Sequence, residues 1–341
     1  MTRQSRLQRI AERAKRRDAK AVRVARRKKK VVAPAPLELM LPMVPVPAPP
    51  SPKPASADPT WFCDPTGRNV HIEGLYRGAS LFLILSGPSA AKMPLEALAT
   101  RGVMTMGVNN SPAIHPCRLW TYVDSPCKFH QGIWRDPACM KFIPFNHYKP
   151  SKGIVKEKIG EAFTQVRRPD GKLAHALDYP GVLGYRRNAN FRPDQWLTEP
   201  TVNWGNDKQH AAVNGHHHIL NVMFVALKIA YVLGFKTVYL VGADFKMTDA
   251  QPYAFDEEEE LAGCGSNNSS YSKLRDMFRI LRSRWDAAGF NVVNVTPGSA
   301  LDSVPAMRFS DAVQAATATM PAEPWDTRRW YDLTNHLEPL P

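Results

Sequence analysis

The amino-acid sequence predicts an α/β fold: a Rossmann-like, mostly parallel sheet with helices on both faces, an irregular insertion and a disordered N-terminal arm. Short, continuous apolar runs such as Leu81–Leu85 are typical of strands that are buried on both faces. Amphipathic helical patterns alternate with the later runs. Several runs also stop abruptly at small polar residues beside proline or glycine, as strands do where they enter a turn.

The apolar periodicity places each element along the chain. Strands are expected over residues 81–85, 102–108, 118–123, 141–144, 181–185, 235–241 and 290–295. A helix is expected over residues 90–99, with Ser89 as a candidate cap, and another should end at Gly234. Leu274, Phe278 and Trp285 belong to a third amphipathic pattern, which ends at Gly289.

The charge of +14 is concentrated at the N-terminus. Residues 1–30 contain 14 Lys/Arg against Glu12 and Asp18, which leaves a net charge of about +2 for the other 311 residues. We expect residues 1–30 to be a solvated, disordered arm that binds nucleic acid or an anionic surface. Residues 31–59 hold ten of the thirty prolines and are expected to form an extended linker.

The remaining chain is expected to form one folded domain and a tail. The α/β domain should span residues 60–310, with residues 127–200 as an insertion or lid whose basic residues meet an acidic ligand or simply face solvent. Residues 311–341 are expected to be a C-terminal extension. The five cysteines form no C-x-x-C pair, and no apolar run is long enough to span a membrane, so a cytoplasmic protein with reduced thiols and no transmembrane segment is expected.

The polar residues that end the strands are the candidate binding site. Ligands of open α/β sheets lie at the carboxyl ends of the strands, so these turns should line one crevice. The corner at Ser86, Gly87, Pro88 and Ser89 could hold a phosphate or ribose through backbone amides, although an ordinary strand-to-helix turn has the same pattern. The other candidate binding residues at strand ends are Asn109, Asn110, Asp124 and Gly242, and Asn214 and Gly215 are candidates just before a later helix.

No metal site is expected. Three neighbouring histidines, His216–His218, would point about 100° apart on a helix and could not converge on one ion. The acidic run Glu257–Glu260 is expected to be a solvated loop. No cofactor is expected beyond a nucleotide-sugar donor substrate.

The order of these motifs resembles a known superfamily. The Gly87–Ser89 turn, Asn109, the run Leu233–Phe245 and Tyr253–Asp256 are similar to motifs of the bacterial lipooligosaccharide sialyltransferases. The superfamily also includes flagellin glycosyltransferases and archaeal hydroxymethylpterin diphosphokinase. A group of phage and prophage proteins with Val-Asn-Asn and Thr-Pro-Gly-Ser motifs is more similar still. The resemblance covers roughly residues 75–310, with its motifs in 81–125 and 213–310.

The resemblance implies a nucleotide-sugar donor, and the matching donor-binding positions are Ser86, Gly87, Pro88, Ser89, Asn109, Asn214, Gly215, Gly242 and Tyr253. This chain differs from those transferases in one respect. They carry a histidine base in the segment that corresponds to residues 263–272, and this segment has no histidine here. Asn267, Asn268, Ser270 and Tyr271 stand there instead, and Asp244 or Asp256 is the candidate base.

Three hypotheses therefore remain after the sequence has been considered. The first is a metal-independent glycosyltransferase-like enzyme. The second is a nucleotide-dependent diphosphokinase that requires Mg²⁺. The third is a non-catalytic phage protein that binds nucleic acid through its basic arm.

Overall fold

The chain divides into two compact units, Met1–Ser56 and Ala57–Pro341. The computed structural model describes only parts of the second unit: residues 61–129, 131–159, 162–188, 193–198, 202–203, 221–247, 253–254, 263–318 and 320. The predicted arm (1–30) and linker (31–59) lie outside the described residues.

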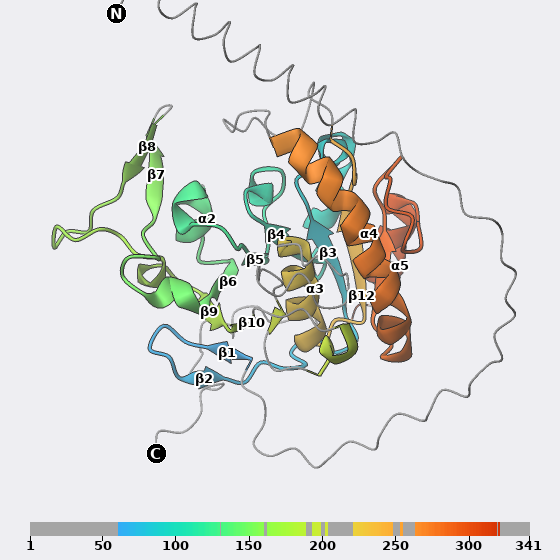
Figure 1. Cartoon of the computed structure of the whole chain (residues 1–341), viewed down its shortest axis with the longest axis horizontal. Helices are drawn as coiled ribbons and strands as arrows, with labels where there is room; N and C mark the ends of the chain where they lie inside the picture. Colours follow the sequence, from blue (N-terminus) through green and yellow to red (C-terminus); the bar gives the residue numbers. More distant parts are fainter. Residues whose placement is uncertain are drawn as a thin grey trace, which may run out of the picture. The chain divides into compact units, whose positions relative to one another are not determined.

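A nine-stranded sheet organises the described part of the second unit (Figure 1). The seven adjacent strands from β13 to β9 run parallel to one another, and β1 and β2 add an antiparallel edge. The predicted α/β class with a mostly parallel sheet is confirmed. In spatial order the strands are β13 (Asn291–Asn294), β12 (Thr237–Val241), β3 (Ser80–Ile84), β4 (Met104–Val108), β5 (Leu119–Thr121), β6 (Met140–Pro144), β9 (Val182–Tyr185), β1 (Phe62–Cys63) and β2 (Asn69–Val70).

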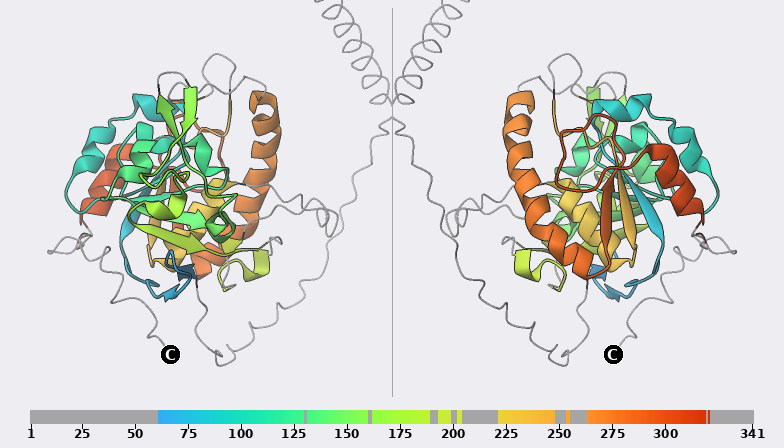
Figure 2. Two further views of the ribbon diagram at one scale, coloured as in Figure 1. Left: turned by 90° about the vertical axis from the view of Figure 1, so that its left-hand side faces the viewer. Right: turned by 90° about the vertical axis from the view of Figure 1, so that its right-hand side faces the viewer.

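Helices cover both faces of this sheet because successive side chains of each strand point to opposite sides. Leu81 and Leu83 of β3 pack in one core cluster with α3 (Val222–Val232) and α4 (Gly263–Ala287). Phe82 and Ile84 pack in a second cluster with α5 (Phe309–Ala318). Figure 2 shows α4 and α5 on opposite sides of the strands.

The predicted helix over residues 90–99 is wrong in detail. Two short 3-10 helices stand there, η1 (Pro88–Lys92) and η2 (Leu95–Ala99). Pro94 separates them, because proline lacks an N–H and disfavours helical geometry in the residue before it. Gly87 is the N-cap of η1, and no side chain caps it, so the predicted cap at Ser89 is also wrong.

The later helix and strand predictions are confirmed. Helix α3 begins after Asn221, whose side chain accepts a hydrogen bond from the Met223 N–H at 2.8 Å. Gly234 follows its last turn with φ at +87°, as expected of a residue that ends a helix. Strand β12 follows at once, and α4 leads into β13 in the same manner.

The stretch 127–200 is not a separate insertion throughout. It supplies β6 and β9 to the main sheet, at the two short runs that the sequence indicates. The rest forms small elements: α2 (Gln131–Arg135), the antiparallel pair β7 (Lys156–Ile159) and β8 (Ala162–Gln165), and β10 (Arg187–Asn188), which pairs with β11 (Val202–Asn203). The 3-10 helices η3 (Ser111–Ala113), η4 (Pro126–Lys128), η5 (Phe145–Tyr148), η6 (Ala176–Asp178) and η7 (Pro193–Gln195) complete the described elements.

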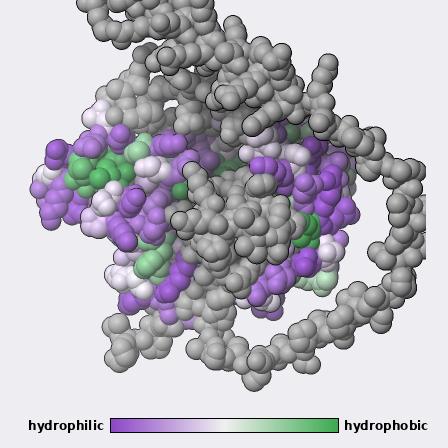
Figure 3. Space-filling view, in the orientation of Figure 1, coloured by the Kyte–Doolittle hydropathy of each residue, from purple (hydrophilic) through white to green (hydrophobic). Residues whose placement is uncertain are grey.

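The predicted boundary at residue 310 is also wrong. It falls inside α5, which packs against the sheet through buried Ala312 and Ala316. None of the described helices has the length and apolarity that crossing a membrane requires. On the face drawn in Figure 3, the described surface is mostly hydrophilic and its hydrophobic residues lie in separate patches.

Candidate functional site

The strand order reverses beside β3, and this defines the candidate site. From β3 the chain runs to β4, β5 and β6 on one side, and β12 then returns to the other side of β3. In open parallel sheets a ligand lies outside the carboxyl ends of the strands at such a reversal. Here the residues at that point are Ser86–Ser89, after β3, and Gly242–Asp244, after β12.

These two turns contact each other directly. The Gly87 N–H donates to the Gly242 carbonyl at 3.1 Å. The Ser89 hydroxyl and N–H both donate to Oδ2 of Asp244, at 2.8 and 3.3 Å. The Ser89 and Gly87 amides, predicted to hold a phosphate, are therefore engaged by acceptors of the protein itself.

Close approach explains the glycine at position 87. A Cβ atom there would lie 2.1 Å from Asp244 Oδ2 and 2.3 Å from the Gly242 carbonyl oxygen, well inside van der Waals contact. Gly242 has φ at +69°, which side-chain-bearing residues rarely adopt. Both glycines thus allow the turns after β3 and β12 to approach each other.

Asp244 is a buried carboxylate with one anchored oxygen. Asp244 is 6% exposed, and its Oδ2 atom accepts both hydrogen bonds from Ser89. Oδ1 has no hydrogen bond to a described residue. A carboxylate held in this way could accept a proton from a hydroxyl that approaches Oδ1.

The turn after β13 holds the Asp244 segment from behind, although Thr296 and Ser299 were not among the predicted site residues. The Thr296 hydroxyl accepts from the Ala243 N–H at 2.8 Å, and the Ser299 hydroxyl donates to the Ala243 carbonyl. The Asp244 carbonyl accepts from the Ala300 N–H at 2.8 Å. The signal in the sequence was the Thr-Pro-Gly-Ser stop after the last strand, which parallels the Ser-Gly-Pro-Ser stop after the first.

Ser86 lies at the centre of the strand ends and keeps an available hydroxyl. Its carbonyl accepts from the Ala254 N–H at 3.0 Å, which brings the neighbouring Tyr253 to this turn. The half-buried Ser86 side chain has no hydrogen bond among the described residues. The backbone hydrogen bond of Ala254 therefore holds this segment beside the turn after β3, and the predicted contact of Tyr253 with a donor stays a prediction.

Asn109 ends β4 in a strained conformation. Its φ of +52° and that of Phe245 (+54°) are the two positive values among the described non-glycine residues. The Asn109 carbonyl accepts from the Trp120 indole at 2.7 Å, but its side-chain oxygen is buried without a hydrogen-bond partner. The β3–β4 pairing ends at Ile84 and Gly107, and carrying this register two residues further sets Asn109 across from Ser86.

The start of α4 holds the loop after β12. Asn268 accepts from the Met247 N–H at 2.8 Å and donates to the Met247 carbonyl at 2.9 Å. The ring of Tyr271 lies 5.2 Å from that of Phe245. Asn268 and Tyr271, at the start of α4, therefore hold the segment that follows Asp244.

Of the other predicted site residues, two have contacts with Lys128 and three lie outside the described residues. Asn110 donates to the Lys128 carbonyl at 3.3 Å. The Asp124 side chain is 57% exposed and pairs with Lys128 at 3.5 Å. Asn214, Gly215 and Asp256 lie outside the described residues.

Two titratable groups with perturbed pKa values lie near the start of β6, away from the strand carboxyl ends. Burial raises the pKa of the Cys139 thiol to about 12. Burial lowers the pKa of Lys141, whose ammonium donates to the carbonyls of Asp136, Cys139 and Pro180 at 2.7, 2.9 and 2.9 Å. Backbone carbonyls accept from both side chains near the start of β6, so we interpret the two groups as structural.

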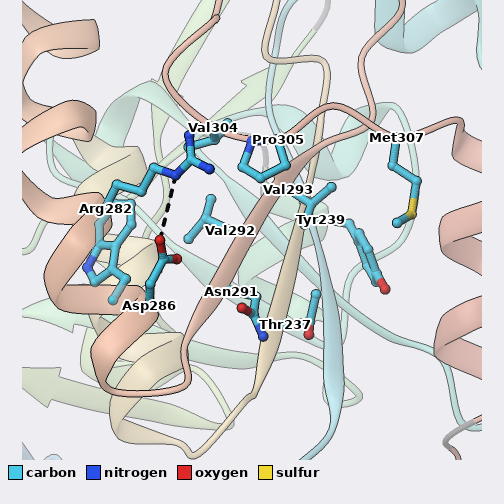
Figure 4. Close-up of a pocket in the computed structure, with 11 residues that line it drawn as sticks. Thr237, Tyr239, Arg282, Asp286, Asn291, Val292, Val293, Val304, Pro305 and Met307 are labelled. Carbon is cyan, nitrogen blue, oxygen red and sulfur yellow. Dashed lines mark ion pairs between the residues drawn. The ribbon is translucent and has the colours of Figure 1, made fainter.

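A cavity of about 250 Å³ lies at the outer edge of the sheet, beside the first residues of β12 and β13 (Figure 4). Its lining includes Tyr239, Val292 and Met307, with Arg282 and Asp286 paired at 3.7 Å. Because it adjoins the amino ends of these strands, it is separate from the carboxyl-end cluster. Within the described part of the chain, no group of three or more His, Cys, Asp or Glu side chains is arranged to hold a metal ion.

Comparison of the chain with protein-family models, with curated proteins and with solved structures finds no match in any of the three.

Proposed function

We propose that this protein is a metal-independent glycosyltransferase-like enzyme that binds a nucleotide-sugar at the carboxyl ends of β3, β4 and β12. The observation that carries the proposal is the buried Asn109 side-chain oxygen, which has no hydrogen-bond partner. Such an atom costs about 1–3 kcal/mol when it stays unpaired. A ribose hydroxyl or a base amino group would supply the missing donor, whereas an ionised phosphate has none to give.

The remaining contacts refine where the nucleotide would lie. Because Gly242 and Asp244 already use the Gly87 and Ser89 donors, the nucleoside part is assigned to Asn109 and the Ser86 hydroxyl. The motifs shared with the sialyltransferases support the same group of residues. Strained residues also gather at functional sites, and both described examples follow strands of this edge.

In the proposed reaction Asp244 is the general base, with Asp256 as the alternative. The acceptor hydroxyl gives its proton to Oδ1 of Asp244 while Ser89 holds Oδ2. The acceptor oxygen bonds to the anomeric carbon of the sugar, and the bond from that carbon to the nucleotide phosphate breaks. The nucleotide leaves with the electron pair, and positioning supplies much of the rate increase.

A ligand-binding screen tests the proposal. Thermal unfolding of the full chain is measured with CMP-, UDP- and GDP-sugars, ATP and nucleoside monophosphates, with and without Mg²⁺. A ligand at 100 times its Kd adds about 2.7 kcal/mol, which raises the midpoint of a domain of this size by about 5–10 °C. If no nucleotide shifts the midpoint at millimolar concentration, the proposal is refuted.

Two variants then locate the site. Asn109→Gly retains a residue that adopts positive φ freely and removes the amide, so the fold should persist while nucleotide affinity falls about 2–10-fold. Ser86→Ala should have a similar effect, and Ser310→Ala makes the same change at an exposed residue of α5 as the control. Equal affinities for all the variants and the unmodified chain contradict the assignment. Binding that requires Mg²⁺ favours the diphosphokinase instead.

A further inference from the structure

A second group of side chains lies on the same edge of the sheet, at the ends of β6 and β9. These strands pair as far as Pro144 and Tyr185, so Phe145 and Arg186 follow in register. The central carbon of the Arg186 guanidinium lies 5.8 Å from the centroid of the Phe145 ring. This distance is within the range of a cation–π contact.

The exposure of this pair is unusual. Phe145 is 40% exposed, and only Met307 is comparable among the large apolar side chains of the described residues. Arg186 is also exposed, and it forms no ion pair with a described residue. An exposed ring beside an unpaired guanidinium is a surface that can take a ligand with both an apolar face and a negative charge.

The ring is held in place from below. The Tyr148 ring packs 4.8 Å from that of Phe145, at an angle of 46°. The Tyr148 hydroxyl donates to the Cys63 carbonyl at 3.1 Å, which anchors it to strand β1. A ligand would therefore meet a ring supported by the sheet.

Charge favours an anionic ligand over a neutral one. The segment 127–200, which contains both residues, has 13 Lys/Arg against 7 Asp/Glu. Lys141 of this segment is fully buried, and its ammonium donates to three backbone carbonyls. The segment that carries Phe145 and Arg186 is therefore basic overall, and a basic segment attracts negative charge.

The position suits an acceptor. Strand β6 is three places from β3 in the sheet, which corresponds to roughly 14 Å at the usual strand spacing. Both groups lie at carboxyl ends of parallel strands, so a ligand at Phe145 and one at Ser86 would share an edge.

We infer that Phe145 and Arg186 form the acceptor subsite of the proposed transferase and that its acceptor is an acidic glycan. The inference rests on the proposed function. One sugar ring packs its apolar C–H face on Phe145, and a carboxylate, sulfate or phosphate of the glycan accepts hydrogen bonds from Arg186.

Isothermal titration with two oligosaccharides of equal length tests this assignment. A hyaluronan tetrasaccharide carries carboxylates, and chitotetraose is neutral. The full chain should bind the acidic oligosaccharide at least tenfold more tightly. Arg186→Gln should remove about five- to tenfold of that preference, because it abolishes a charge-assisted hydrogen bond. Phe145→Ala should weaken both ligands, and Phe145→Trp should restore binding.

Arg167→Gln is the matched control. Arg167 is exposed, belongs to the same basic segment and donates to the Gly171 carbonyl of its own turn at 2.6 Å. If Arg167→Gln weakens the acidic ligand as much as Arg186→Gln does, general charge explains binding and the subsite is refuted. The absence of any tetrasaccharide binding refutes it as well.

The nucleotide screen on the same preparations separates this inference from the proposed function. Nucleotide binding without oligosaccharide binding overturns the acceptor subsite alone. Oligosaccharide binding that depends on Phe145 and Arg186, without any nucleotide binding, supports the glycan surface and overturns the transferase.

Discussion

Gly87→Ala should destabilise the protein strongly, because this glycine is where the turns after β3 and β12 touch. The added methyl carbon would lie 2.1 Å from Asp244 Oδ2 and 2.3 Å from the Gly242 carbonyl oxygen. The second atom belongs to the backbone, so a side-chain rotation cannot relieve the contact. We expect the two turns to separate.

The cost follows from the hydrogen bonds that this separation breaks. One neutral bond, from Gly87 to Gly242, and the charged interaction of Ser89 with Asp244 would be lost. At about 1 kcal/mol for the neutral bond and about 1.5–3 kcal/mol for the charged one, the loss is about 2.5–4 kcal/mol. For a domain of this size that loss lowers the unfolding midpoint by about 5–16 °C.

Urea and thermal unfolding of Gly87→Ala and Gly132→Ala provide the measurement and its control. Gly132 lies in helix α2, and a Cβ atom there would meet no atom within 4 Å. The control should be neutral or more stable by up to about 1 kcal/mol, because alanine favours helix. If the two variants unfold at the same midpoint, the direct contact between the turns is refuted.

Three further predictions concern burial and charge. Burial raises the pKa of the Cys139 thiol from about 9 to about 12. The protonated thiol therefore contributes its full stability to the folded state below pH 9, and this contribution is lost as the pH rises toward 12. Between pH 9 and 12 the free energy of unfolding should fall less steeply with pH in Cys139→Ala than in the unmodified chain, by about 1.4 kcal/mol per pH unit. Urea unfolding at several pH values measures this dependence, and the same dependence in both proteins would contradict the prediction. Lys141→Met leaves three buried carbonyls without their donor and should cost about 2–4 kcal/mol in urea unfolding, against under about 0.5 kcal/mol for the exposed Lys172→Met; equal costs would refute a structural role. Deleting residues 1–30 lowers the net charge by 12 and should abolish salt-dependent binding to random-sequence duplex DNA in fluorescence anisotropy, whereas binding that persists, or binding only to anionic vesicles, argues against a nucleic-acid arm.

The strands and the long helices were predictable because their signals are local. The continuous apolar run Leu81–Leu85 needed a position covered on both faces, and the core clusters supply one on each side of β3. Gly234 predicted the end of helix α3, because glycine readily adopts the positive φ that it has there. The helix predicted over residues 90–99 is wrong because Pro94 interrupts it, and two 3-10 helices stand there instead.

The candidate site was predictable only in part. The stops after the strands identified Ser86, Gly87 and Gly242, because parallel strands present their carboxyl ends at one edge. Nothing in the sequence indicated that Asp244 would accept both Ser89 donors, since these residues are 155 positions apart. The sequence predicts no role for Asn268, and its two hydrogen bonds to the Met247 backbone depend on the tertiary structure.

The sequence by itself determined which segments become buried strands and helices, because apolar periodicity and turn residues act over a few positions. It also determined that small polar residues end those strands. The tertiary structure alone decided which of those ends meet, because the strand order sets β12 beside β3 and moves Asp124 away to an exposed turn. It likewise decided that the Asp244 carboxylate accepts from the Ser89 N–H, which was predicted to hold a phosphate, and that the buried side-chain oxygen of Asn109 has no hydrogen-bond partner.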